Sequence, residues 1–365
     1  MDSIYKVGNT ESIDSPAILV YPELIIKNIL KATGIAGGPG LLRPHVKTHK
    51  MVEVSKFLLE AGIDKFKCAT IAEAEMLVMA GAKDILLAYQ PTAVKATRLA
   101  KLAQANPEVM FGYLVDNKES ALTLHQLLFA ANIKPWIDVN VGMNRTGIKP
   151  AAAAELYRYM LNDLEIKPAG LHGYDGHIHD TDTNTRFAKA EAIYLSMTAL
   201  AHELENEYHH LPQLVLGGTP CFPYYASQPG IQSSPGTFVF WDSGYSKMFP
   251  DMDFVVSAVL LTRVISVIDE QTICLDLGHK SVAAESPLPR VVFPDHPEAS
   301  VIGQSEEHLV VKIPDSTIIN VGDEWFGIPV HICPTVALYD SVQVINEGFA
   351  TESWKVIARD RAITV

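Results

Sequence analysis

The stretch LLRPHVKTHK, at residues 41–50, places a lysine among several other basic side chains. Two leucines begin it, Pro44 stiffens it, and a helix-like run over residues 51–60 follows at once. We therefore expect a strand that delivers Lys47 to the mouth of a sheet, followed by a helix that leaves it. Neighbouring cations and partial desolvation both favour the neutral amine and lower the pKa of such a lysine. A neutral amine is a nucleophile that can form a Schiff base, whereas a basic loop that binds an anion or stays in solvent is the simpler alternative.

Two glycine-containing turns follow the last two of eight strand-like runs. The first turn reads GGTP and contains Gly218 and Thr219, and the second reads PGT and contains Gly236 and Thr237. Glycines let backbone N–H groups approach a phosphate closely, and a threonine hydroxyl adds a donor. Two such turns on adjacent strands would converge on one phosphate dianion, although either turn alone is also typical of an ordinary loop.

A polar loop follows the sixth strand-like run, where residues 171–180 read LHGYDGHIHD and include Tyr174. A metal site that includes His177, His179 and Asp180 is conceivable here, but a His-x-His pair needs further ligands. The alternative is a surface loop with incidental histidines.

Two other strand ends carry polar residues. Arg145 lies in the string NVGMNRTG at residues 140–147, after the fifth run. Helix capping or a salt bridge would also explain an arginine at this position. Tyr89 and Gln90 close the third run, so we expect them to face the same mouth.

The string PVHICPT, at residues 329–335, pairs a histidine with a cysteine. Residues two apart on a strand point to the same side, so His331 and Cys333 could bind one ion together. An imidazole and a thiolate suit zinc, and two protein ligands leave room for water and substrate, as a catalytic site requires. A buried cysteine that lies beside a histidine without any metal is the common alternative.

The elements that must position these residues alternate along the chain. Strand-like apolar runs lie at residues 41–47, 65–69, 84–89, 109–115, 136–141, 169–174, 213–217 and 231–235. Helix-like stretches separate most of them, at residues 51–61, 71–80, 92–104, 118–131, 150–161 and 183–207. Eight strands that alternate with helices predict a parallel (β/α)8 TIM barrel, with a doubly wound sheet as the alternative. In a barrel the active site lies at the carboxyl ends of the strands, where the polar groups above occur.

The pattern changes after about residue 245, where helical periodicity fades. Runs rich in valine, isoleucine and aromatic residues lie at residues 255–268, 272–277, 291–293, 308–313 and 325–330. They predict a second, mostly β domain. We therefore expect a barrel over residues 21–245 and a β domain over residues 246–365 that carries the metal site.

The totals restrict the class of protein. The 365 residues are 48% hydrophobic, and the formal net charge is -13 without any basic tract. A chain of this composition folds around a sizeable core, and its charge argues against nucleic acid or an anionic membrane as a partner. The four cysteines include no CxxC pair, which indicates a reducing compartment. Since neither a signal-peptide core nor a membrane-length apolar run is present, we expect a cytoplasmic protein.

The string RPHVKTHK, at residues 43–50, closely resembles the lysine motif of the D-threonine aldolase and D-serine dehydratase family. Members of that family are fold-type III pyridoxal 5'-phosphate (PLP) enzymes built like alanine racemase. The resemblance covers nearly the whole chain and implies a TIM barrel followed by a C-terminal, mostly β domain, which residues 1–20 join. It implies that Lys47 carries PLP covalently, while the neighbouring Lys50 has no such role.

The resemblance also implies roles for other residues. Tyr174 is expected beside the cofactor ring. Arg145, in a string similar to the Gly-Met-x-Arg-x-Gly of alanine racemases, is expected to contact the cofactor region. The family carries its metal pair, as His-x-Cys or His-x-Asp, where this chain has His331 and Cys333. The family's phosphate-binding turns match Gly218, Thr219, Gly236 and Thr237.

Two differences from alanine racemases bear on the chemistry. Alanine racemases lack the His-x-Cys pair, so its presence argues against simple racemisation. They also place an arginine, which meets the pyridine nitrogen, just before the Pro-Gly that follows the eighth strand. Here Ser234 precedes Pro235 and Gly236, so the sequence does not identify the group that faces the pyridine nitrogen.

The resemblance implies a lyase that depends on PLP and a divalent metal, zinc or manganese, and acts on β-hydroxy D-amino acids. The string CPTVALY, at residues 333–339, resembles chains classed with the aldolases and favours cleavage to glycine and an aldehyde. Deamination to a 2-oxo acid and ammonia, as in D-serine dehydratase, is the alternative. An amino-acid racemase and a non-catalytic PLP-binding protein are further alternatives.

A barrel hydrolase that uses only a metal would leave the lysine motif unexplained. Racemase-like enzymes form homodimers in which the β domain of one chain covers the barrel mouth of the other, so a homodimer is implied here. Candidates for the base that acts on the β-hydroxyl group are His177, His179 and His279.

Overall fold

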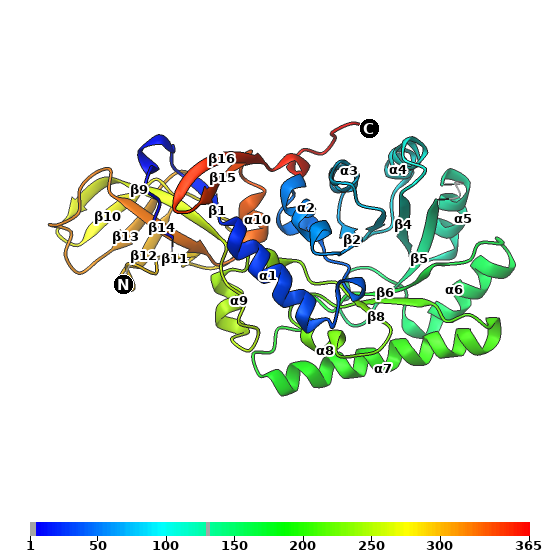
Figure 1. The fold of residues 1–365 in the computed structure, drawn as a ribbon. Helices are drawn as coiled ribbons and strands as arrows, with labels where there is room; N and C mark the ends of the chain where they lie inside the picture. The colour runs from blue at the N-terminus through cyan, green and yellow to red at the C-terminus, as the bar shows by residue number, and fades with distance from the viewer. Residues whose placement is uncertain (1–4, 129–131) are drawn as a thin grey trace. The chain divides into compact units, whose positions relative to one another are not determined.

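The computed structural model describes residues 5–128 and 132–365, and Figure 1 colours its helices and strands in chain order. The chain divides into two units, and each of them is discontinuous in sequence. We call Ile29–Lys47, Val52–Gly236 and Asp360–Val365 the barrel unit. The β unit comprises the chain up to Asn28, Thr48–Met51 and Thr237–Arg359. The chain therefore leaves the barrel unit directly after Lys47 and again directly after Gly236.

The barrel unit contains a seven-stranded parallel sheet in which the strands neighbour one another in chain order. The strands are β2 (Lys65–Cys68), β3 (Asp84–Leu87), β4 (Met110–Val115), β5 (Ile133–Val139), β6 (Gly170–Gly173), β7 (Gln213–Leu216) and β8 (Ile231–Ser233). In β2, β3, β4, β6 and β7 every residue after the first is buried. This continuous burial is typical of a parallel sheet that is covered on both faces.

Helices alternate with these strands. They are α2 (Val52–Glu60), α3 (Ile71–Ala80), α4 (Ala93–Ala105), α5 (Lys118–Leu127), α6 (Pro150–Asn162), α7 (Thr183–Tyr208) and α8 (Phe222–Ala226). Local chemistry fixes their ends: Thr70 caps α3 by accepting the N–H of Glu73, and Gly81 ends α3 in the left-handed conformation. The helix predicted over residues 118–131 is observed as α5, but residues 129–131 lie outside the described part of the chain.

Residues 42–45 complete the sheet as an extended segment between its first and last strands. Leu42 pairs in parallel with Ser233 of β8, and His45 pairs in parallel with Lys67 of β2. Backbone hydrogen bonds of 2.9 Å accompany both pairings. With this eighth position filled, the sheet closes on itself. The predicted barrel is confirmed, and the doubly wound sheet is excluded.

The strand predicted over residues 41–47 is shorter than expected. The extended segment ends near His45, and the 3-10 turn Val46–Thr48 follows. Pro44 has no N–H to donate to a ladder, and the N–H of Lys47 donates to the Nδ1 atom of His45 at 3.2 Å. Lys47 therefore lies in a turn just beyond the end of the strand.

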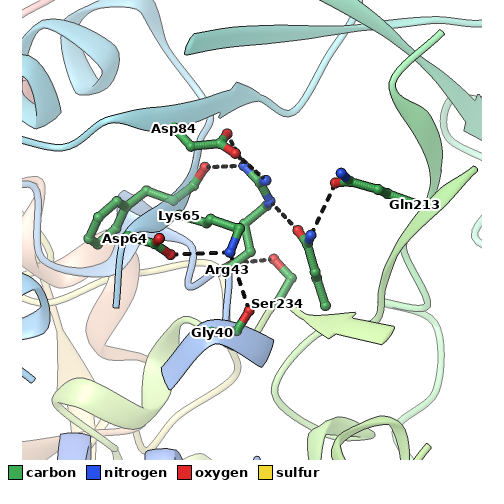
Figure 2. Close-up of polar contacts among 9 residues, drawn as sticks. Gly40, Arg43, Asp64, Lys65, Asp84, Gln213 and Ser234 are labelled. Carbon is green, nitrogen blue, oxygen red and sulfur yellow. Dashed lines mark hydrogen bonds and ion pairs between the residues drawn. The ribbon is translucent and has the colours of Figure 1, made fainter. Parts of the chain in front are cut away.

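Arg43 is fully buried in this closing segment, and Figure 2 shows its polar contacts. Its guanidinium donates to both carboxylate oxygens of Asp84, at 2.7 and 2.9 Å, and to Oε1 of Gln232 at 2.8 Å. The Oγ atom of Ser234 donates to the backbone carbonyl of Arg43 at 2.9 Å. Asp84 begins β3 and Gln232 lies in β8, so Arg43 ties the closing segment to the sheet on both sides.

The β unit is built on a nine-stranded sheet with the path β12-β13-β10-β9-β1-β15-β16, and β14 pairs with both β9 and β11. Its strands are β1 (Ala17–Val20), β9 (Ala258–Asp269), β10 (Thr272–Leu275), β11 (Val291–Val292), β12 (Ser300–Gln304), β13 (Leu309–Lys312), β14 (Glu324–Pro329), β15 (Ser341–Asn346) and β16 (Phe349–Lys355). Strand β1 pairs antiparallel with β9 and parallel with β15, so the N-terminal strand lies inside this sheet.

Three helices accompany these strands in sequence, namely α1 (Pro22–Ile35), α9 (Ser243–Met248) and α10 (Ile332–Val336). The mostly β character predicted for the C-terminal part of the chain is confirmed. Within the described ranges, no helix combines the length and the apolar character that a membrane crossing requires.

Replacing Arg43 with methionine should lower the free energy of unfolding by about 2–4 kcal/mol, because the Asp84 carboxylate and nearby acceptors lose a buried donor. Water compensates part of this loss, since the Asp84 side chain is 37% exposed. Urea unfolding followed by circular dichroism measures the change. The matched control is Lys83→Met, which removes a surface pairing with Glu108 at 3.7 Å and should change stability little. Equal losses in the two variants would contradict a stabilising role for the buried network.

Candidate active site

Lys47 and Tyr174 lie together at the carboxyl ends of the barrel strands. Tyr174 comes directly after Gly173, the last residue of β6. The Nζ atom of Lys47 lies 5.6 Å from the centre of the Tyr174 ring. The carboxyl ends of parallel barrel strands form one mouth, where barrel active sites lie. The structure thus brings two of the predicted site residues together at this mouth.

Two further cations share the Tyr174 ring. The Cζ atom of Arg145 lies 5.0 Å from the ring centre, and the Nζ atom of Lys67 lies 5.6 Å from it. Cations at such distances are attracted by the negative face of an aromatic ring. The sequence predicts Arg145 at this site but not Lys67. The signal that could have found Lys67 is a lysine near the end of a strand that otherwise reads as buried.

Lys67 begins a buried chain of polar side chains. Its Nζ atom lies 3.5 Å from Nε2 of His172, and Nδ1 of His172 lies 2.7 Å from Oδ1 of Asp138. The hydroxyl of Thr146 donates to Oδ2 of the same carboxylate at 2.8 Å. The side chains come from β2, β6, β5 and the loop after β5, so the chain crosses between strands that are not all neighbours in the sheet.

The charges in this chain follow from burial and contact. Burial alone would raise the pKa of Asp138, but its hydrogen bonds with His172 and Thr146 lower it. Burial lowers the pKa of His172, so the imidazole is neutral. Burial and the nearby Lys47 lower the pKa of Lys67 to about 7. The neutral imidazole therefore donates from Nδ1 to the Asp138 carboxylate and accepts at Nε2 from Lys67.

The two glycine turns meet at the same mouth. The N–H of Gly236 donates to Oγ1 of Thr219 at 3.1 Å, which joins the turn after β8 to the turn after β7. The N–H of Gly218 donates to Oδ1 of Asp175 at 2.8 Å. Burial raises the pKa of the Asp175 carboxyl. Both glycine N–H groups are therefore engaged within the protein.

The remaining candidates of the barrel unit do not form a second cluster. His177 and His179 are exposed, and Asp180 pairs with Lys189 at 2.7 Å. Within residues 5–128 and 132–365, no three side chains of histidine, cysteine, aspartate or glutamate gather as a metal site.

Tyr89, Gln90 and Ser234 each contact another residue of the barrel unit. The Nζ atom of Lys95 lies 4.4 Å from the Tyr89 ring centre, and burial raises the pKa of Tyr89 to about 12. The Oε1 atom of Gln90 accepts the backbone N–H of Asp116. Ser234 uses its hydroxyl hydrogen on the carbonyl of Arg43, so that hydrogen is not free for a pyridine nitrogen.

His331 and Cys333 lie in the β unit, but not on one strand as their spacing predicts. Strand β14 ends at Pro329, Cys333 belongs to the short helix α10, and His331 is the N-cap residue of that helix. The expectation fails because Pro334, inside the string, has no N–H for a strand ladder and is tolerated in the first turn of a helix. The two side chains still meet through a hydrogen bond. Burial lowers the pKa of His331, but the hydrogen bond and charge of Cys333 together with Asp242 and Glu285 outweigh burial and raise it to about 9.

Other groups of the β unit hold this pair. The Nδ1 atom of His331 lies 2.6 Å from Oε1 of Glu285, and the Sγ atom of Cys333 lies 3.2 Å from Oγ1 of Thr48 and 3.5 Å from Oγ1 of Thr237. Asp242 accepts the N–H of Ile332 at 3.1 Å, which anchors the start of α10. Burial raises the pKa of Asp242 to about 6.

Comparison with known proteins gives two family matches. Residues 22–243 match the model described as alanine racemase, N-terminal domain, and residues 257–345 match the model described as putative serine dehydratase domain.

Individual relatives agree with these matches. A D-threonine aldolase from Arthrobacter sp is 26% identical over 326 residues, which cover 87% of this chain and 85% of the relative. The crystal structure of D-threonine aldolase from Filomicrobium marinum superimposes with a TM-score of 0.85 at 24% identity, over 98% of this chain and 99% of that one. A mutant of D-threo-3-hydroxyaspartate dehydratase, solved in a metal-free form, superimposes with a TM-score of 0.81 at 21% identity, over 94% and 97% of the two chains. These two superpositions show the fold alone.

The glycine at position 217 offers a sharp test of the packing behind the site. Gly217 has φ +77°, and a Cβ atom there would lie 2.5 Å from ring carbons of Tyr225. Gly230 has nearly the same φ, +75°, but open space around it. Gly217→Ala should therefore lower the free energy of unfolding by about 2–3 kcal/mol, and Gly230→Ala by about 1 kcal/mol from backbone strain alone. Equal losses on chemical denaturation would show that Tyr225 moves aside without cost.

Proposed function

The chain belongs to the family of the alanine racemase N-terminal domain, and from that membership we propose that it is a PLP-dependent lyase acting on β-hydroxy D-amino acids. The observation that carries the proposal is the position of Lys47 beside Tyr174 and Arg145 at the barrel mouth. The names of the relatives, which are aldolases and dehydratases of this substrate class, support the choice of reaction.

The residues at the mouth fit PLP. Lys47 offers an amine to the cofactor's aldehyde, Tyr174 offers an aromatic face to the ring, and Arg145 offers a cationic donor beside it. A Cβ atom at Gly218 would lie 3.0 Å from Cε2 of Tyr174, so glycine keeps this side of the ring open. These side chains therefore suit an anionic aromatic aldehyde that one lysine binds.

We assign the phosphate of PLP to the two turns after β7 and β8. Since the N–H groups of Gly218 and Gly236 donate within the protein, we expect these glycines to provide room rather than hydrogen bonds. The hydroxyls of Thr219 and Thr237 are then the side-chain donors for the phosphate.

When bound, PLP supplies an electron sink for the carbanion that remains at Cα after a bond to that carbon breaks. The protein residues select the bond. In the aldolase reaction the β-hydroxyl loses its proton, the Cα–Cβ bond breaks, its electron pair stays on Cα, and an aldehyde leaves. Cα then takes up a proton to give glycine. In the dehydratase reaction Lys47 holds the α-proton at Nζ and hydroxide leaves Cβ, which leads to a 2-oxo acid and ammonia.

We propose His331 and Cys333 as the protein ligands of a divalent metal. Glu285 engages Nδ1 of His331, which leaves Nε2 as the coordinating nitrogen, and such a carboxylate partner is common behind metal-binding histidines. Imidazole with thiolate suits zinc, with manganese as the alternative. The metal would supply a Lewis acid for the substrate's β-hydroxyl group. The metal-free form of a related dehydratase mutant supports a metal in this family.

Of the two reactions we propose aldol cleavage, because residues 333–339 resemble chains classed with the aldolases. Dehydration is the second candidate, since residues 257–345 match a putative serine dehydratase domain and include both proposed metal ligands. We also propose a homodimer, by analogy with racemase-like enzymes.

Product analysis tests the reaction. The purified protein, supplied with PLP and zinc or manganese, is incubated separately with D-threonine and D-serine, and the products are identified by mass. Glycine with acetaldehyde from D-threonine supports the aldolase. A 2-oxo acid with ammonia supports the dehydratase, and bound PLP without turnover supports a carrier protein. A change of chirality alone would make the protein a racemase.

Lys47→Ala should abolish covalent attachment of PLP and reduce turnover by at least about a thousandfold, because the amine that holds the cofactor and moves protons is lost. Lys50→Ala is the matched control and should retain both. Borohydride reduction followed by peptide mass spectrometry locates the attachment. A Lys47→Ala protein that kept PLP absorbance and full turnover would contradict the proposed function.

Loss of a metal ligand should weaken metal binding without preventing the attachment of PLP. His331→Gln and Cys333→Ser should each lower metal affinity about 10- to 100-fold or more, while PLP still attaches to Lys47. Metal content by elemental mass spectrometry and attachment by borohydride reduction are measured on the same samples. Retention of one tightly bound metal per chain in the double variant would contradict the assignment.

A further inference from the structure

A buried carboxyl group contacts the turn after β7, to which we assign the PLP phosphate. We propose that Asp175 is a positioning residue that holds this turn at a fixed place relative to the ring of Tyr174. The inference rests on the proposed binding of PLP and deepens it, because it names the side chain that sets where the phosphate lies relative to the cofactor ring. All the residues concerned belong to the barrel unit.

Asp175 joins the strand that carries the ring to the turn after β7. It follows Tyr174 directly in sequence and is 1% exposed. Its Oδ1 atom accepts the backbone N–H of Gly218 at 2.8 Å, and its own carbonyl accepts the N–H of Ile178 at 2.9 Å. A buried N–H that loses its acceptor costs free energy, so the turn cannot separate from Asp175 freely. Asp175 is therefore tied both to its own loop and to the turn after β7.

The same turn packs against the Tyr174 ring. A Cβ atom at Gly218 would lie 3.0 Å from Cε2 of Tyr174 and 3.7 Å from Oδ1 of Asp175. On the other edge of the ring, a Cβ atom at Gly176 would overlap Cε1. The two edges of the ring thus lie against the backbones of Gly176 and Gly218. Loss of the bond between Asp175 and Gly218 would therefore change the position of the turn relative to the ring.

The hold on Gly218 extends to the second glycine turn. Thr219 follows Gly218, and its Oγ1 atom accepts the N–H of Gly236 at 3.1 Å. Strands β6, β7 and β8 are consecutive neighbours in the sheet, so the contacts run from the end of β6 across both turns. Covalent bonds fix the separation of ring and phosphate in PLP. A protein that holds both places in advance loses less free energy when the cofactor binds.

The surroundings of Asp175 suit a hydrogen-bond acceptor near a phosphate. Burial raises the pKa of its carboxyl, although Cys221, Tyr225 and the N–H of Gly218 act in the opposite direction. A raised pKa limits the negative charge on this group, and with it the repulsion of a phosphate dianion. The acceptor oxygen is thus the feature that the role requires, and asparagine retains such an oxygen.

The test compares two cofactors that differ only in the phosphate group. The full-length protein, freed of cofactor, is titrated separately with PLP and with pyridoxal, which has the same ring and aldehyde. Attachment is fixed with borohydride and counted by intact mass. Asp175→Leu has a similar shape without the acceptor, so half-saturation by PLP should require about tenfold more cofactor, while the value for pyridoxal changes less than about twofold. Asp175→Asn keeps the acceptor and should retain the PLP value of the parent protein.

Asp182→Leu is the matched control. This carboxylate also accepts a backbone N–H, that of Thr185 at 2.8 Å, but it is exposed at the start of α7. Its loss should leave both half-saturation values unchanged. In Asp175→Leu, equal losses for PLP and pyridoxal, or no loss for either, would overturn the positioning role. A parent protein that attaches PLP no better than pyridoxal, or attaches neither at Lys47, would contradict the proposed function and remove the basis of the inference.

A measurement on the parent protein covers the case in which Asp175→Leu does not fold, as judged by circular dichroism. Hydrogen exchange is followed at the Gly218 amide, by fragmentation of a peptide that contains the turn. Because Asp175 holds this N–H, the amide should exchange slowly before PLP is added and equally slowly afterwards. Protection that appears only when PLP is added would show that the phosphate takes the N–H instead, and would overturn the inference.

Discussion

The pairing of residues 42–45 with both the first and the last strand of the sheet is the interaction on which the barrel unit depends. This pairing closes the seven-stranded sheet into a barrel. It also determines where the extended segment before Lys47 ends. Register in a sheet is a strict constraint, because a shift of one residue sends each side chain to the opposite face. Arg43 adds a second hold on the same segment, through Asp84 of β3 and Gln232 of β8. The position of Lys47 is therefore set by backbone pairing before any side chain of the site is considered.

The interior of this barrel contains charged groups where most barrels are filled with branched apolar side chains. Arg43, Lys67, His172 and Asp138 are all nearly inaccessible to water. Such groups cost free energy unless their hydrogen bonds are satisfied, and here each has a partner from another element. Where a sequence breaks the rule of an apolar core, function is the usual reason. Near the amino ends of the strands, buried Arg43 helps to close the sheet. Near their carboxyl ends, cationic side chains lie around the Tyr174 ring.

Much of the barrel follows from the sequence, because the periodic apolar runs and caps such as Thr70 are local signals. The site residues at strand ends are predictable for the same reason, since a parallel sheet brings its carboxyl ends together. The contacts inside the barrel are not predictable, because the pairing of Lys67 with His172 depends on closure rather than on spacing. Strand β16 shows a different limit. Its burial pattern leaves six of seven residues at least partly exposed, so no apolar alternation marks it. The helix that contains Cys333 was not predicted, because the string at residues 329–335 reads as a strand.

The two crossings of the chain that follow Lys47 and Gly236 bear on how such a protein can be cut or recombined. Each unit is made of segments that the other interrupts, so no single break in the gene yields either unit whole. A continuous fragment that keeps the closing segment and all the strands of the barrel, residues 42–236, contains Thr48 but loses Thr237, one of the two hydroxyl neighbours of Cys333. A fragment that starts at Thr237 keeps His331 and Cys333 but lacks β1, a central strand of its own sheet. Exchange of a whole unit between relatives therefore requires several simultaneous junctions.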